Sequence, residues 1–154
     1  MRTMSVIEVD QSNKIEQPRS TTIAFSDGVS FAIILPHKMK TEAVRYLRNQ
    51  GKTKQTAHVL IFAAGVFLLL RDFLDQVHRV VIDVEYPGWE DTIKAFLLQR
   101  TRRTQTDFEE WRITFDQIGK SSQAHRKANA VRDSRNRGYR IIRIEEMLES
   151  LESK

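Results

Sequence analysis

The sequence predicts an α/β fold built on a mixed sheet, and three observations lead to this prediction. Three strand-like segments, rich in β-branched and aromatic residues, open the chain. Helix-like and strand-like segments then alternate through the remainder. Between the two parts lies an apolar run, AHVLIFAAGVFLLL at 57–70, which suits a helix packed against a sheet. Three antiparallel strands followed by αβ units give a sheet of five or six strands with helices on both faces.

The three opening strands are expected to form an antiparallel meander. They are SVIEVD at 5–10, TTIAFS at 21–26 and VSFAIILP at 29–36. Asp27-Gly28 separates the last two, and Asp-Gly is typical of two-residue hairpin turns because it tolerates positive φ angles. The second and third strands are therefore predicted to pair directly.

Two helices are expected after the meander. TEAVRYLRNQ at 41–50 is a short amphipathic segment, and Gly51-Lys52 ends it. The next helix is predicted from about Lys54 to Asp75 and contains the apolar run of 14 residues. Because a bilayer requires about 20 apolar residues, we expect a buried central helix rather than a membrane span.

Strands and helices alternate in the second half of the chain. Glu90 and Asp91 mark one helix start, since acidic side chains favour the positive end of the helix dipole. A serine is expected to cap the next helix, which is predicted at 121–136. The predicted segments are a strand at 79–87, a helix at 90–103, a strand at 111–118, a helix at 121–136, a strand at 137–144 and an acidic helical tail.

The composition indicates a single domain over residues 1–154. Apolar residues make up 40% of the chain, which is enough for a core. The chain has no cysteine, which excludes disulfides and zinc–thiolate sites, and its first ten residues lack the apolar core of a secretory signal. We therefore expect a cytoplasmic protein without a membrane partner. The sequence does not determine the oligomeric state, and a homo-oligomer is one of the states that it allows.

Positive charge is concentrated between Arg100 and Arg143. This stretch holds twelve basic and five acidic residues, whereas the net charge of the whole chain is +5. Arginine predominates there, and its planar guanidinium group suits phosphate oxygens. The stretch is a candidate for binding a nucleic-acid backbone, and a solvated basic surface is the alternative.

Two acids interrupt the apolar strand-like segment RVVIDVEYPG at 79–88. A buried carboxylate without a partner is costly, so Asp83 and Glu85 must be neutralised or face something positive. Residues two apart on a strand project to the same face, which would place both acids on one side. Oxygen ligands on neighbouring strands suit Mg²⁺ or Mn²⁺, and such an ion would account for the charge.

Three short motifs resemble those of one group of nucleases. They are D-x-S-x-K-I-E beginning at Asp10, I-D-x-E-Y-P-G around Asp83, and I-G-K-x-S-x-A-H ending at His125. With the order of elements, they resemble the ribonuclease H-like nucleases, and among these a small archaeal group of 3′→5′ exonucleases acting on single-stranded DNA. The Asp-Asp-His combination is similar to that of Piwi-type slicer domains. The resemblance covers nearly the whole chain.

The resemblance implies a set of catalytic positions. One aspartate is expected on the first strand, a second at the end of the fourth, and a third group at the start of the helix after the fifth. Asp10, Asp83 and His125 are the candidates. Together with Glu85 they are expected to hold one or two Mg²⁺ or Mn²⁺ ions, which serve phosphodiester hydrolysis. His125 could complete the ligand set or transfer protons, because imidazole titrates near neutral pH.

The sequence departs from the wider family pattern in one respect. Ribonuclease H-like enzymes typically carry a glutamate on the first helix, whereas the helix from Lys54 has no carboxylate before Asp72. Glu85 is one substitute, and Glu42 on the preceding short helix is the other. The number of bound metal ions therefore stays open.

Polar residues near the motifs are candidates for phosphate contacts. Lys120 and Ser121 adjoin the start of the helix predicted at 121–136, whose N-terminal amides could hold a phosphate, and Arg126 follows in the same helix. Lys14, close to the first motif aspartate, could act likewise. Ordinary loop lysines are the alternative.

Three aromatic residues could stack on unpaired bases: Tyr86, Trp89 and Tyr139. Trp89 stands out because it lies close in sequence to the acids. A buried structural tryptophan is the alternative.

The sequence leaves two other functions open. One is a structure-specific endonuclease, either a junction resolvase, which should be an obligate dimer, or a ribonuclease acting on hybrids. The other is a non-catalytic nucleic-acid-binding module, which would bind with a steep salt dependence and stay inert with metal. A restriction-endonuclease-like site is disfavoured because no lysine follows Asp83-Val84-Glu85. Cleavage polarity and the preference for DNA come from the resemblance alone.

Overall fold

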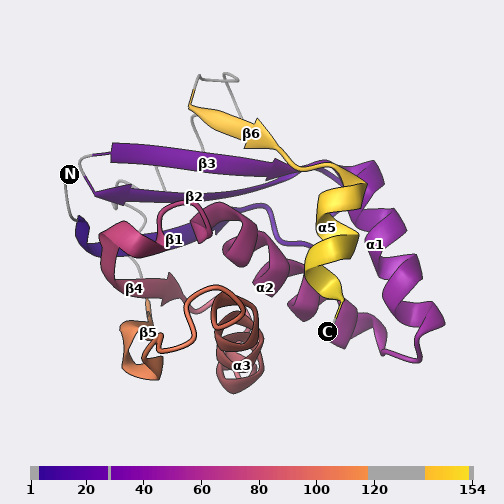
Figure 1. The fold of residues 1–154 in the computed structure, drawn as a ribbon. Coiled ribbons are helices and arrows are strands. Elements are labelled where there is room, and N and C mark those ends of the chain that lie inside the picture. The colour runs from indigo at the N-terminus through magenta and orange to yellow at the C-terminus, as the bar shows by residue number, and fades with distance from the viewer. Residues whose placement is uncertain (1–3, 28, 118–137, 153–154) are drawn as a thin grey trace.

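The computed structural model describes residues 4–27, 29–117 and 138–152. These residues form a six-stranded sheet in the order β5-β4-β1-β2-β3-β6, with helices packed beside it (Figure 1). The strands are β1 (Met4–Ser12), β2 (Thr21–Asp27), β3 (Val29–Leu35), β4 (Val77–Asp83), β5 (Ile113–Asp116) and β6 (Tyr139–Ile141). The helices are α1 (His37–Asn49), α2 (Lys54–Leu70), α3 (Glu90–Thr101) and α5 (Ile144–Leu151).

The sheet combines an antiparallel part with parallel pairs. β1 pairs with β2 and β2 with β3 in antiparallel fashion, and the β2–β3 ladder extends to Asp27 and Val29, as the predicted hairpin requires. The pairs β1–β4, β4–β5 and β3–β6 are parallel. The predicted α/β class and the antiparallel meander are thus confirmed.

The two faces of the sheet carry different side chains. Successive residues of a strand point to opposite faces, and Ile7 and Val9 of β1 are fully buried in the main core with the helices. Asp10 therefore belongs to the other face. Its antiparallel partner there is Ala24, which forms a separate small cluster with Ala32 and Ile34.

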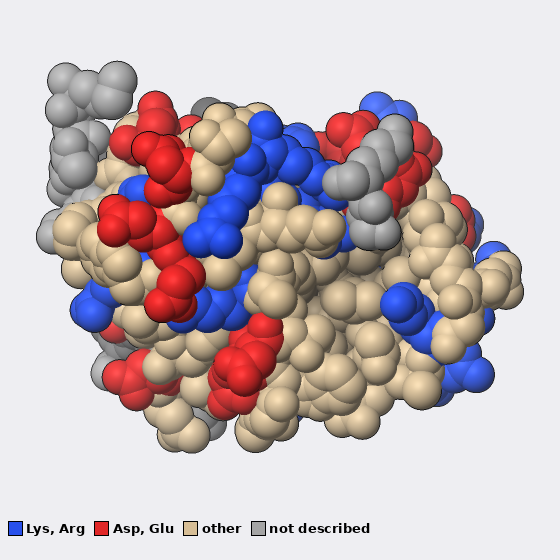
Figure 2. Space-filling model, turned by 60° about the horizontal axis from the view of Figure 1, so that its bottom comes forward, with Lys and Arg blue, Asp and Glu red and all other residues tan. Residues whose placement is uncertain are grey.

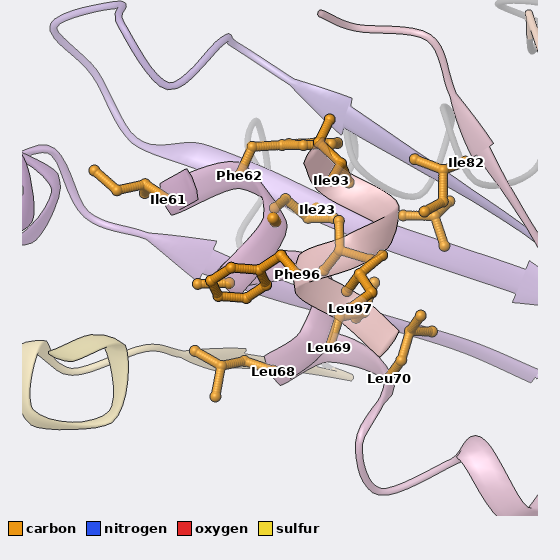
Figure 3. Packing of buried hydrophobic residues seen from close by; sticks show 14 of the residues in the cluster. Ile23, Ile61, Phe62, Leu68, Leu69, Leu70, Ile82, Ile93, Phe96 and Leu97 are labelled. Atoms are coloured by element: carbon orange, nitrogen blue, oxygen red, sulfur yellow. The ribbon is translucent and has the colours of Figure 1, made fainter. Parts of the chain in front are cut away.

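The described helices share one hydrophobic core, on the face of the sheet opposite Asp10. α2 lies at its centre, and Figure 3 shows Phe96 and Leu97 of α3 beside Leu68 and Leu69 of α2. The sequence predicts helices on both faces, whereas the described helices all contribute to this one core. The helix predicted at 121–136 lies outside the described residues.

The boundaries of α1 and α2 differ from the predicted ones. α1 begins at His37, earlier than predicted, because the helical conformation starts directly after Pro36, which is extended with ψ at 147° and acts as the N-cap. α2 ends at Leu70 instead of Asp75. A turn and a short 3₁₀ helix, η1 (Leu74–Gln76), then lead into β4.

The strands of the second half are shorter than predicted. β4 ends at Asp83 because the last residue of its partner β5, Asp116, pairs with it there. Glu85, expected on the strand, lies beyond its end. The start of the predicted fifth strand is instead a 3₁₀ helix, η2 (Glu110–Arg112), and β6 covers only Tyr139–Ile141 of the predicted 137–144.

In the part of the chain that the structure describes, no helix is long and apolar enough to cross a membrane. α2, which contains the apolar run, has 17 residues and is packed against the sheet and the other helices. The prediction of a buried central helix is therefore confirmed.

Candidate metal centre

Two aspartates meet where the parallel strands β1 and β4 run side by side. Val9 of β1 is paired with Ile82 of β4, so Asp10 and Asp83 are the next residues along both strands. They project from the same face because paired residues of neighbouring strands share a face. The sheet itself thus brings together two carboxylates that are more than seventy residues apart in sequence.

A third carboxylate joins them from the turn after β4. Asp10, Asp83 and Glu85 each offer an oxygen atom, and these atoms lie within 4.8 Å of one another. The sequence correctly associates Glu85 with Asp83, but the reason given, alternation along one strand, is wrong. The ladder has ended at Asp83, and the turn brings Glu85 to the cluster instead.

The three carboxylates repel one another. Asp10 is 3% exposed, and its Oδ1 accepts a hydrogen bond from the Gln11 N–H at 2.8 Å. Burial, the negative charges of Asp83 and Asp10, and a hydrogen bond with Asp83 raise the pKa of Glu85 to about 8, while Lys14 acts in the opposite direction. Without a cation, Glu85 therefore keeps its proton to a higher pH than an ordinary glutamate does.

This arrangement fits a hard divalent cation. All three ligands are carboxylate oxygens, the donor type that Mg²⁺ and Mn²⁺ prefer. A cation would also offset the repulsion that holds the proton on Glu85. Asp10, Asp83 and Glu85 are the residues that could hold it.

Lys14 lies next to this cluster. Its Nζ donates a hydrogen bond to the main-chain oxygen of Glu85 at 3.2 Å and lies 5.6 Å from the centre of the Tyr86 ring. The side chain is otherwise exposed, so it could also reach an anion near the carboxylates.

The aromatic candidates are less accessible than their sequence positions suggest. Tyr86 is 9% exposed, with its ring 5.2 Å from that of Phe62 and its hydroxyl group hydrogen-bonded internally. Trp89 is half-buried against the main core at the N-terminus of α3. Burial excludes Tyr86 as a stacking surface and favours a structural role for Trp89.

Two other acids bear on the predicted ligand set. Glu42, the alternative substitute, is exposed on α1 and lies outside the cluster. Asp116 ends β5 as the direct partner of Asp83 and is exposed, and it also lies outside the cluster.

Several predicted site residues lie outside the described part of the chain. They are His125, Lys120, Ser121 and Arg126. Their predicted roles therefore stay predictions.

Four described arginines of the basic stretch bind main-chain carbonyl groups, and the other two, Arg140 and Arg143, pair with the carboxylates of Glu146 and Glu145. Arg100 donates to the oxygens of Ser150 and Leu151 at 3.0 and 3.1 Å, which secures the end of α5, and burial lowers its pKa to about 10. Further such contacts are Arg102 to Phe108, Arg103 to Glu152, and Arg112 to Val77 and His78. Each of these side chains therefore has a contact within the fold, while Arg102, Arg103 and Arg143 remain exposed.

Basic and acidic side chains lie close together on one face of the molecule. Figure 2 shows the molecule from the side of α3 and β5, where a compact group of basic side chains has acidic side chains directly beside it. A continuous basic track does not run across this view of the described residues.

Comparisons with protein-family models, with curated proteins and with solved structures give no match for this chain. What the centre can do chemically therefore follows from its own residues and geometry.

Proposed function

We propose that this protein is a divalent-metal-dependent nuclease that hydrolyses phosphodiester bonds and trims single-stranded DNA from its 3′ end. The observation that carries the proposal is the cluster of three carboxylates at the ends of β1 and β4. The antiparallel meander followed by parallel strands is compatible with the ribonuclease H-like resemblance. The choice of DNA and of the 3′ end rests on that resemblance.

The protein's own groups have distinct roles in this proposal. Asp10 and Asp83 are fixed by the sheet and supply rigid oxygen ligands, while Glu85 completes the set from the turn. A bound Mg²⁺ or Mn²⁺ supplies electrostatic stabilisation of the charge that develops during phosphodiester cleavage and lowers the pKa of water. Lys14, exposed beside the carboxylates, can contact a phosphate of the strand.

The test is a cleavage assay with end-labelled strands. The purified protein is incubated with 5′-labelled or 3′-labelled single-stranded DNA or RNA, in Mn²⁺, Mg²⁺ or EDTA. We expect 5′-labelled DNA to shorten stepwise with metal only. Asp83→Asn should reduce the rate at least about 100-fold, because a metal ligand is weakened.

The matched control is Asp107→Asn, which makes the same change at an exposed aspartate outside the cluster. It should cleave like the wild-type protein. Cleavage that survives in EDTA, or equally in Asp83→Asn, would contradict the proposal. Salt-sensitive strand binding without cleavage would instead identify a binding module, and cutting only of branched DNA or of hybrids would identify the endonuclease alternatives.

A further inference from the structure

Glu85 differs from the other two carboxylates in what holds it in place. Asp10 and Asp83 belong to paired strands, whereas the chain leaves the sheet before Glu85. The last bond to β5 is donated by the Val84 N–H to the main-chain oxygen of Asp116 at 3.1 Å. The Glu85 side chain is hydrogen-bonded to Asp83, but the main chain that carries it must be held by contacts outside the sheet.

The β1–β2 loop, residues 13–20, supplies these contacts. The Tyr86 hydroxyl group accepts a hydrogen bond from the Ile15 N–H at 3.1 Å and donates one to Glu16 Oε1 at 3.2 Å. Lys14 Nζ binds the main-chain oxygen of Glu85 at 3.2 Å. The loop thus holds the turn on both sides of the Glu85–Tyr86 peptide.

The Tyr86 side chain is itself rigidly placed. Only 9% of it is exposed, and its ring packs against Phe62 of α2 with the centroids 5.2 Å apart. Burial raises the pKa of Tyr86 above its ordinary value, so the phenol keeps its proton and remains a donor. The ring is fixed by the core and the hydroxyl group by the loop.

The loop that makes these bonds is ordered by α1. Lys40 is 2% exposed, and its Nζ donates to the oxygens of Ile15 and Gln17 at 3.0 and 3.1 Å and to Thr21 Oγ1 at 2.9 Å. Asn13, which has a φ of 64°, closes the loop with a bond from its Nδ2 to the Ser20 oxygen at 3.2 Å. A loop fastened in this way can position another segment.

We propose that Tyr86 is a positioning residue that holds Glu85 in the carboxylate cluster by fastening the turn after β4 to the β1–β2 loop. The inference rests on the proposed metal-dependent function, because it assigns Tyr86 a part in cation binding. Tyr86 acts through Glu85 and touches neither cation nor substrate. Loss of a group that hydrogen-bonds a metal ligand directly typically weakens metal binding by about 10- to 100-fold, and Tyr86, which acts through the main chain, should lie at the lower end of that range.

The experiment measures Mn²⁺ affinity by calorimetry in a double-mutant cycle. Tyr86→Phe removes only the hydroxyl group and should weaken Mn²⁺ binding about 10-fold. In a Glu85→Gln background, which retains Asp10 and Asp83, the same change should have no further effect. Tyr46→Phe, at a half-buried position of α1, is the matched control and should bind like the wild-type protein.

Amide hydrogen exchange of the metal-free protein gives a readout that does not depend on the proposed function. In Tyr86→Phe, residues 13–17 and 84–88 should exchange faster, while α3 stays unchanged. Unchanged exchange in those segments, or an equal loss of affinity with and without Glu85, would overturn the inference. If the wild-type protein binds no Mn²⁺, the metal-dependent function fails, and the exchange data alone decide whether Tyr86 holds the turn.

Discussion

Glu85 shows how strongly the protonation of one residue depends on its neighbours. Burial and the two nearby aspartates raise its pKa to about 8, although Lys14 partly opposes them. The sheet holds Asp10 and Asp83 side by side. Their carboxylates therefore repel each other and Glu85 whenever no cation is present, and this repulsion lowers the stability of the folded protein. At this scale, the centre is a site of local destabilisation that a bound cation would relieve.

This charge arrangement predicts how stability depends on pH in EDTA. Because the pKa of Glu85 is higher in the folded protein than in the unfolded chain, the unfolded chain binds fewer protons between about pH 4.5 and pH 8. The free energy of unfolding should therefore fall as the pH rises through this range. Urea denaturation of the metal-free protein at several pH values measures it.

Glu85→Gln should flatten this pH dependence, since the amide does not titrate. The control is Glu42→Gln, an exposed position on α1, which should keep the slope of the wild-type protein. A Glu85→Gln protein with an unchanged slope would show that other groups cause the pH dependence.

At the scale of elements, the close approach of α2 to the sheet depends on Gly65. A Cβ atom at this position would lie 2.7 Å from Ile23 Cδ1 and 3.2 Å from Leu35 Cδ1, and both of those residues are fully buried. In the sequence, Gly65 stands out only because it is a glycine within a strongly apolar helical segment. The structure shows that it lets the helix lie against β2 and β3.

Gly65→Val is expected to destabilise the protein by about 2 kcal/mol, because the added atoms overpack a filled core. Lys54→Val places the same side chain at an exposed position of α2 and should cost less than about 1 kcal/mol. Chemical denaturation compares the two variants. Because valine is a better helix former than glycine, helix propensity does not account for a loss in Gly65→Val, and equal losses in the two variants would contradict the role of the close contact with the sheet.

At the scale of the whole molecule, cation binding should stabilise the fold as a unit. The carboxylates come from β1, β4 and the turn after it, so the complete set exists only when these distant segments are paired. A ligand that binds only the folded state adds about 2.7 kcal/mol at 100 times its dissociation constant. We expect Mn²⁺ to raise the melting temperature and EDTA to reverse the increase.

Asp10→Asn should abolish most of this increase, while Asp107→Asn should preserve it. Thermal unfolding with and without Mn²⁺ measures the difference. An equal increase in both variants would show that Mn²⁺ binds elsewhere.

Much of the fold could be predicted from sequence because its signals are local. Alternating apolar residues, Asp27-Gly28 and the apolar run each identify an element without knowledge of its partners. The end of β4 could not be predicted in this way, since VVIDVEYP reads as one strand and the limit is set by pairing with Asp116. The start of α1 at His37 could not be predicted either, because its N-cap, Pro36, makes no side-chain hydrogen bond that a sequence pattern would indicate.

The candidate site was predicted in part for the same physical reason. Asp10, Asp83 and Glu85 could be identified from short motifs, but the roles of Tyr86 and Arg100 depend on burial and on partners far away in sequence. The number of arginines in the sequence likewise does not show that Arg100 binds carbonyl oxygens at the end of α5. Sequence therefore suggests which groups carry the chemistry more reliably than it shows which groups support them.

The position of β1 in the sheet has a consequence for synthesis of the chain. Its antiparallel partner β2 follows within a few residues, whereas its parallel partner β4 begins only at Val77. While the chain emerges from the ribosome, the meander can form early, but one edge of β1 lacks its partner until β4 has been made. During that interval nascent chains expose an open strand edge and are most prone to pair with one another.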